Sequence, residues 1–290
     1  MDERLLTEAQ EIAYGGERVT HLYPNDCYFA HLSIYYYALQ YALEKKVLDA
    51  GCGSGYGSYY LRKNGARQVE ALDISRVAIG FCKKYFSYPK LRFRISSLVK
   101  INGYKKRTFD LIFTSNVLEH VPDVTKFLDK AHMLLKPDGV LLIAVPPVVD
   151  ETSRKNNIDN KYHLNIWTPR QWYMAISTYF DQVQCVFHSF KNQNVVLDFG
   201  NTPENTRVNE KDFTFEPVMI DEFYKEAPLT VMFEARSPVK SNPKNPSFTF
   251  IEESLTRALV VDDPPMEPRR KSNIGILTRL SQFFRKFVGR

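Results

Sequence analysis

Cysteine is scarce in this chain, and long apolar runs are missing. The 290 residues include only 4 cysteines, which form no Cys-x-x-Cys pair and have no histidine at ligand spacing. This argues against a disulfide framework and against a zinc site built on cysteine. No run reaches the ~18 apolar residues of a membrane-spanning helix. The first residues are acidic and polar, where a signal peptide would be basic and then apolar. We therefore expect a cytoplasmic protein.

Basic charge is concentrated at one end of the chain. The formal net charge is +6, but residues 269–290 alone carry seven Lys and Arg side chains and no acid, so the remainder is close to neutral. Within this segment, apolar residues recur at helical spacing opposite the cations. Such a helix suits an anionic membrane interface or a protein partner, and its apolar stripe would be wasted on nucleic acid. We predict that residues 272–290 bind the inner face of the cytoplasmic membrane or a protein, and we expect no nucleic-acid partner.

Between about residues 40 and 150, short apolar runs rich in β-branched residues alternate with helical stretches. This alternation is typical of βαβ units with helices on both faces of a parallel sheet. Ser75 and the pair Thr168-Pro169 indicate helix starts, and the Pro and Gly of residues 136–139 indicate a helix end. We predict an α/β fold with a doubly wound, mostly parallel, seven-stranded sheet. The expected strands lie at residues 47–49, 69–73, 91–95, 109–113, 140–145, 183–187 and 230–235.

A glycine-rich segment, DAGCGSGYG at residues 49–57, joins the first expected strand to the next helix. Its glycines let the backbone approach a ligand closely, at the sheet edge where open α/β folds bind nucleotides. The G-x-G-x-x-G spacing of a dinucleotide site fails because Tyr56 stands at its last position, and no Lys-Ser/Thr pair follows for a P-loop. Asp49 can face a cationic or amino-bearing ligand. Asp73, at the end of the next strand, can accept hydrogen bonds from ribose hydroxyls.

These residues resemble those of class I S-adenosylmethionine (SAM)-dependent methyltransferases. The segment 47–55 is one of four segments that resemble motifs of the family. The other three follow in the family's order at 73–75, 109–122 and 134–147. The resemblance implies SAM as cofactor and S-adenosylhomocysteine as product. Where the family often has an acid that contacts adenine, this chain offers Ser97 or a main-chain amide. The cofactor-binding residues that the resemblance implies are Asp49, Gly51, Cys52, Gly53, Gly55, Tyr56, Asp73, Ile74, Ser97, Ser115 and Tyr35.

Two segments before residue 40 resemble the lead-in of a methyltransferase subgroup associated with surface-polysaccharide and glycan biosynthesis. That lead-in reads G-E-R and later E-H-x-x-R-Y-x-F-A. This chain keeps Glu17, His31 and Tyr35, but Ala30 and Ile34 replace the acid and the arginine. The resemblance implies that Tyr35 and Glu17 lie over the methionine end of SAM. The alternative for the tyrosine run is one face of an amphipathic helix.

The expected organisation has several parts. Residues 1–40 form a helical lead-in over the cofactor site, and residues 41–237 form the methyltransferase domain. Within that domain, residues 192–228 are too many for a hairpin loop and are expected to form an insertion or lid. Six of the sixteen prolines mark a linker at 238–268, which precedes the basic amphipathic helix of 269–290.

Methyl transfer is an in-line displacement that depends mainly on positioning, and a sugar hydroxyl is a poor nucleophile that gains from a general base. We expect His163, just beyond the fifth strand, to be this base, with His120 second. The alternative for His120 is a structural role. Ubiquinone-biosynthesis O-methyltransferases carry E-x-x-E-H after the fourth strand and hold a divalent ion there. Asn116 replaces the first of these acids, so we predict no metal.

The sequence therefore predicts a SAM-dependent methyltransferase that O-methylates a sugar, a polysaccharide or a lipid-linked glycan. One alternative acceptor is a quinone, lipid or natural-product hydroxyl. The other alternative is a catalytically inactive, methyltransferase-like scaffold that recruits a partner through its C-terminal tail. The intact glycine segment and Asp73 argue against a scaffold, because a scaffold does not need a ligand-ready loop.

Overall fold

The computed structural model describes residues 3–14, 17–192 and 195–239. The predicted linker beyond residue 239 and the predicted basic helix at 269–290 lie outside these ranges and stay predictions. In the described part, no helix is both long and apolar enough to cross a membrane.

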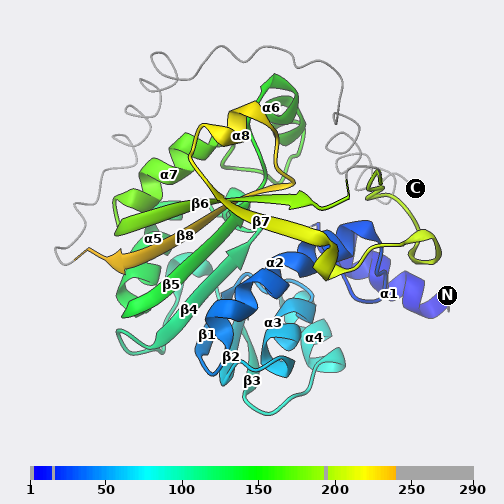
Figure 1. The fold of residues 1–290 in the computed structure, drawn as a ribbon. Helices are drawn as coiled ribbons and strands as arrows, with labels where there is room; N and C mark the ends of the chain where they lie inside the picture. The colour runs from blue at the N-terminus through cyan, green and yellow to red at the C-terminus, as the bar shows by residue number, and fades with distance from the viewer. Residues whose placement is uncertain (1–2, 15–16, 193–194, 240–290) are drawn as a thin grey trace.

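One eight-stranded sheet runs through the described part of the chain (Figure 1). Its strand order is β3-β2-β1-β4-β5-β8-β6-β7, with parallel pairing from β3 to β5 and antiparallel pairing from β5 to β7. The predicted α/β class is confirmed. The strands are β1 (Lys46–Ala50), β2 (Gln68–Asp73), β3 (Leu91–Ile95), β4 (Phe109–Ser115), β5 (Leu135–Val145), β6 (Phe180–Phe190), β7 (Phe213–Val218) and β8 (Thr230–Pro238).

The prediction of seven strands was wrong by one. The additional strand, β7, lies inside the segment predicted as an insertion, and it pairs antiparallel with β6 from Cys185 opposite Val218 to Phe190 opposite Phe213. β6 is 11 residues long, so without β7 it would present a long open edge. Pro217 disguised this strand in the sequence, because proline is excluded from central strands but is compatible with an edge.

Helices cover both faces of the sheet, as expected of a doubly wound fold. Side chains of α2, α3 and α4 share one apolar cluster with the strands, and those of α5 and α7 share another. The first cluster includes Ile34 and Phe113, and the second includes Phe127 and Trp172. The helices are α1 (Glu3–Tyr14), α2 (Asp26–Ala42), α3 (Tyr56–Lys63), α4 (Arg76–Tyr85), α5 (Val124–Leu134), α6 (Glu151–Ile158), α7 (Pro169–Ser177) and α8 (Glu222–Lys225).

The helix starts follow the capping residues in the sequence. Ser75 accepts a hydrogen bond from the N–H of Ala78 at the start of α4, and Thr168 and Gln171 form a capping box at the start of α7. The helix end that residues 136–139 indicated is close to the observed one, but the start of the following strand, predicted at residue 140, differs from the structure. α5 ends at Leu134 and β5 begins at the next residue, so residues 136–139 belong to β5 instead of a loop.

Candidate active site

The glycine segment turns from β1 into α3 at the carboxyl edge of the parallel strands. Gly51 has a φ of +96°, and a Cβ at this position would overlap the methyl groups of Val117, which follows β4. Gly55 caps α3 with a φ of +85°, and a Cβ there would lie 2.6 Å from Cys82 Sγ. Glycine is therefore required at both positions by the backbone conformation and by close packing.

Asp73, the last residue of β2, ties the glycine segment to its surroundings. Its Oδ2 accepts a hydrogen bond from the N–H of Gly53 at 3.0 Å, and its Oδ1 accepts one from the N–H of Ser75 at 2.8 Å. Arg18 Nη2 lies 3.4 Å from the same Oδ1. This single carboxylate therefore holds together the glycine segment, the start of α4 and the chain that follows α1.

Asp49, the first residue of the glycine segment, lies in β1 and is fully buried. Its Oδ2 accepts hydrogen bonds from Ser58 Oγ at 2.5 Å and from Tyr35 Oη at 3.4 Å. Its Oδ1 has no hydrogen-bond partner among the described residues. Burial raises the pKa of Asp49 to about 7. A buried acceptor without a partner is costly, because it has lost its hydrogen bonds to water.

A first cavity, of about 340 Å³, opens above the glycine segment. We call it the loop cavity. Of the residues predicted to bind the cofactor, seven line it: Tyr35, Gly51, Cys52, Gly53, Tyr56, Asp73 and Ser115. Four others do not line it. Asp49 is buried in β1, and Gly55 caps α3. Ser97 precedes a short helical turn after β3, and Ile74 is 72% exposed to solvent.

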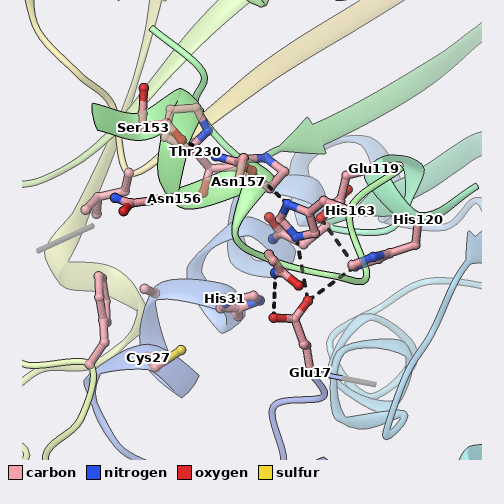
Figure 2. Close-up of a pocket in the computed structure, with 17 residues that line it drawn as sticks. Glu17, Cys27, His31, Glu119, His120, Ser153, Asn156, Asn157, His163 and Thr230 are labelled. Carbon is pink, nitrogen blue, oxygen red and sulfur yellow. Dashed lines mark hydrogen bonds and ion pairs between the residues drawn. The ribbon is translucent and has the colours of Figure 1, made fainter. Parts of the chain in front are cut away.

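A second cavity, of about 140 Å³, adjoins the loop cavity (Figure 2). We call it the polar cavity, because hydroxyl and amide side chains from α6 and the residues after it line one wall. The polar side chains of this wall are Ser153, Asn156, Asn157 and Asn160. The two cavities share four lining residues: Glu17, His31, Asn116 and His120. The two cavities therefore lie against each other.

The wall between the cavities is formed by residues far apart in the sequence. Glu17 and Asn116 both lie there with positive φ angles, of 54° and 52°. These conformations are unfavourable for residues other than glycine, and such strain often accompanies functional sites. His31, on α2, is the third member, and burial lowers its pKa to about 4, so its imidazole is neutral.

Glu17, His120 and His163 converge in the polar cavity, and we call them the Glu–His–His cluster (Figure 2). Glu17 Oε2 lies 3.6 Å from His163 Nε2 and 3.9 Å from His120 Nε2. Burial alone would raise the pKa of the Glu17 carboxyl. The effects of nearby His163 and Asn160 outweigh that of burial and hold the pKa below its ordinary value. Burial lowers the pKa of His120. The structure thus brings together the two predicted catalytic histidines and adds a carboxylate.

The segment that carries His163 is fixed by main-chain contacts to the turn after β4. Glu119 O accepts hydrogen bonds from the N–H groups of Leu164 and Asn165, at 2.7 and 3.0 Å. Asn165 is buried, and its Nδ2 donates to the carbonyls of Leu118 and Val121. Sequence reasoning missed Asn165, and the available signal was a polar amide inside an otherwise apolar stretch before Trp167.

The asparagines around His163 were also missed. Asn157 Oδ1 lies 2.7 Å from His163 Nδ1, and Asn160 Nδ2 donates to Glu17 Oε1 at 2.7 Å. Their signal in the sequence was the concentration of amides between residues 156 and 160. The sequence could not show which other segment these amides would meet.

The segment between β6 and β7 covers the polar cavity from another side. Phe199 lines the cavity, and its carbonyl accepts a hydrogen bond from Asn25 Nδ2 at 3.0 Å. Asp26, at the start of α2, accepts bonds from Asp198 N–H and from Asn201 Nδ2. This part of the predicted insertion is therefore anchored to α2, and its role as a lid stays a prediction.

Comparisons with known proteins agree with this architecture. A family model described as a methyltransferase domain matches residues 33–200. A protein of Mycolicibacterium smegmatis named probable S-adenosylmethionine-dependent methyltransferase is 27% identical over 119 residues, which are 41% of this chain and 45% of that protein. A ubiquinone biosynthesis O-methyltransferase of Actinobacillus pleuropneumoniae is 33% identical over 106 residues, 34% of this chain and 45% of that enzyme. The match thus spans less than half of each curated relative.

Among solved structures, a SAM-dependent methyltransferase from Thermotoga maritima superimposes with a TM-score of 0.54 at 16% identity. The match covers 73% of this chain and 91% of that one. At this identity the likeness concerns the fold alone. The chain therefore belongs to the methyltransferase-domain family and has the Rossmann-like fold of class I SAM-dependent methyltransferases.

Proposed function

We propose that the protein transfers a methyl group from SAM to a hydroxyl group of a sugar or a lipid-linked glycan. The observation that carries this proposal is the contact between the loop cavity and the polar cavity at Glu17, His31, Asn116 and His120. In-line transfer requires the nucleophile about 3 Å from the methyl carbon, so donor and acceptor sites must open into each other. The four shared lining residues place the two cavities side by side, which supports such an arrangement.

The residues around the loop cavity fit SAM. Its floor is main chain at Gly51 and Gly53, where side chains would obstruct a ligand or strain the backbone. SAM carries a positive sulfonium and an ammonium group, and two buried acids lie at or below the cavity, Asp49 and Asp73. By its resemblance to the family's ribose-binding acid, Asp73 would hold the ribose. Asp49 does not line the cavity, but it accepts a hydrogen bond from Tyr35, which does.

The polar cavity fits a polyhydroxylated acceptor. Asn156 lines this cavity, and its Nδ2 has no hydrogen-bond partner among the described residues, so it can donate to a sugar hydroxyl. Pro147 and Phe199 add apolar surface for the C–H face of a sugar ring. A second candidate acceptor, a quinol hydroxyl, is supported by the named activity of the Actinobacillus relative. The amide-rich wall favours the sugar.

The Glu–His–His cluster would activate the acceptor. When bound, SAM supplies a methyl group whose bond to sulfur breaks as the new O–CH₃ bond forms, and the sulfur keeps the electron pair. The proton of the hydroxyl leaves towards the cluster, of which Glu17 and His120 line both cavities. His163 stays our prediction for the base, since its ring reaches only the polar cavity, and His120 stays second.

Calorimetric titration with S-adenosylhomocysteine tests the cofactor site. We expect micromolar binding, and we expect Asp73→Ala to weaken it at least about 100-fold, because this change removes a ligand acceptor and releases Gly53 and Ser75 together. Asp138→Ala is the matched control, since Asp138 is exposed at the far end of β5. Absence of binding by the unaltered protein would contradict the enzyme proposal and favour the scaffold. Transfer of labelled methyl to lipid-linked sugars and to quinols then distinguishes the two acceptor classes.

A further inference from the structure

We propose that Glu17, His120 and His163 form a binding site for a divalent first-row transition metal ion such as Zn²⁺. One oxygen or nitrogen atom from each side chain lies within 4.8 Å of the other two. Two imidazoles and one carboxylate, with the remaining positions open, form a donor set that binds such ions in proteins. The site faces the polar cavity, where the acceptor is proposed to bind.

The hydrogen bonds of both histidines leave their Nε2 lone pairs free to bind an ion. His120 Nδ1 lies 2.9 Å from the main-chain oxygen of Tyr162, which can only accept, so Nδ1 carries the proton. His163 Nδ1 faces Asn157 Oδ1, and the orientation of that amide is fixed because Asn157 Nδ2 donates to the Ser153 carbonyl at 2.8 Å. Metal-binding histidines have this arrangement, in which one ring nitrogen donates to an oxygen and the other holds the ion.

The third donor is held in the same way. Asn160 Nδ2 donates to Glu17 Oε1 at 2.7 Å, which leaves Oε2 directed towards the two imidazoles. When both imidazoles are neutral, three acceptor atoms face one another, and they repel unless a positive charge lies between them. A protonated histidine would form a charge-assisted hydrogen bond of about 2.7 to 2.9 Å. The observed 3.6 and 3.9 Å are longer than that.

The separations are close to those of ligands around one ion. Bonds of about 2.0 to 2.1 Å place neighbouring ligand atoms about 3.0 to 3.4 Å apart, so a small inward movement of the three side chains would complete the site. Glu119 adds a separate observation. It lines the same cavity, is only 2% exposed, lies 3.7 Å from His120 Nε2, and its Oε2 has no hydrogen-bond partner among the described residues. A cation at the cluster would offset the cost of burying this group.

This inference revises the expectation of metal independence, which considered only residues 116–120. Its structural part rests on geometry alone, and its catalytic meaning rests on the proposed function. An acceptor hydroxyl at an open position of the ion would lose its proton more easily. Both Nε2 lone pairs would then be held by the ion, so the proton would pass to water in the cavity instead of to His163.

Equilibrium dialysis of the full chain against ZnCl₂, after treatment with a chelator, measures the site directly. We expect one ion per chain, and we expect His163→Ala and His120→Ala to weaken binding at least about 100-fold, because even partners that only orient a ligand contribute 10- to 100-fold. Asn157→Ala, which keeps all three donors, should weaken binding by about that smaller factor. Bound Co²⁺ should give a visible spectrum typical of nitrogen and oxygen ligands. Mg²⁺ should not compete, since it prefers an all-oxygen site.

His132→Gln is the control, because it removes a histidine that bonds to the Val239 carbonyl away from both cavities. A cooperative urea-unfolding transition shows that each variant is folded, and the unaltered protein is titrated with S-adenosylhomocysteine alongside. If the unaltered protein binds this ligand but no Zn²⁺, or if all variants bind Zn²⁺ equally, the metal inference is overturned and the proposed function stands. If Zn²⁺ binds as expected but the ligand does not, the metal site stands and the proposed function fails.

Discussion

The loop cavity and the polar cavity are built in different ways. The loop cavity is formed mainly by short segments at the ends of neighbouring parallel strands, with Gly51, Asp73 and Ser115 at the ends of β1, β2 and β4. The polar cavity draws its walls from residues as distant as Glu17 and Thr230. The loop cavity can therefore be predicted from local sequence motifs. The polar cavity cannot, because it forms only when segments far apart in the sequence come together.

The antiparallel strands account for this difference. β8 pairs with β5, and β6 pairs with β8, so the chain returns to the middle of the sheet near its end. Thr230 of β8 and Phe199, from the segment anchored to α2, thereby line the same cavity as the residues of α6. If the two cavities bind different ligands, changes in the polar cavity should alter acceptor chemistry, and changes around the loop cavity should alter cofactor binding.

The largest expected effect is that of His163→Ala. His163 lines the polar cavity and not the loop cavity, so this change should lower kcat by about 10²- to 10⁴-fold. The affinity for S-adenosylhomocysteine should stay within about twofold, because the Asp73 contacts are untouched. Steady-state kinetics and calorimetry on the same preparation check both. A parallel fall in cofactor affinity would mean that the two cavities are one site.

Gly57→Ala should disturb the loop cavity. A Cβ on Gly57, in α3, would overlap the ring of Tyr35, which is buried and contacts Asp49. Overpacking of this kind costs about 1 to 3 kcal/mol of unfolding free energy, and displacement of Tyr35 should weaken SAM binding. Urea unfolding and calorimetry measure the two effects.

Gly80→Ala is the matched control for that change. Gly80 lies in α4, and a Cβ there has no atom within 4 Å. Alanine should be neutral or should stabilise the helix by up to about 1 kcal/mol. Equal destabilisation by the two alanines would show that packing against Tyr35 is not the cause.

The last prediction concerns a pH dependence that comes from Asp49. Because burial raises its pKa to about 7 in the folded chain, the folded state holds this proton more tightly than the unfolded state. The contribution of Asp49 to the free energy of unfolding should therefore fall as pH rises from about 4 through 7. Cationic SAM favours the ionised form, so its affinity should rise over the same range, by at most about tenfold per pH unit.

Asp49→Asn cannot ionise and should remove this slope from both measurements. Calorimetric titrations with SAM at several pH values, together with urea unfolding, compare the variant with the unaltered protein. A slope that persists in the variant would assign the titration to another group.

Local signals predicted most of the fold. Alternating apolar runs indicated the five parallel strands, and capping residues such as Ser75 and Thr168 marked helix starts correctly. β7 was missed, because Pro217 weakens the strand pattern and only pairing with β6 makes it a strand. The start of β5 was missed because Pro137 and Gly139 are typical of a turn. In the structure, residues 136–139 form an irregularity in the strand, between Leu135 opposite Phe109 and Val140 opposite Leu111.

The sequence by itself determined the α/β fold and the glycine segment, because both depend on the spacing and size of neighbouring residues. It also identified His120 and His163, but not that they face each other across Glu17. Only the tertiary structure decided that meeting, since Glu17 and His163 lie 146 positions apart and are joined by the folding of α2, α6 and the sheet between them. The free energy that places these charged groups together comes from packing elsewhere in the molecule, and no local pattern records it.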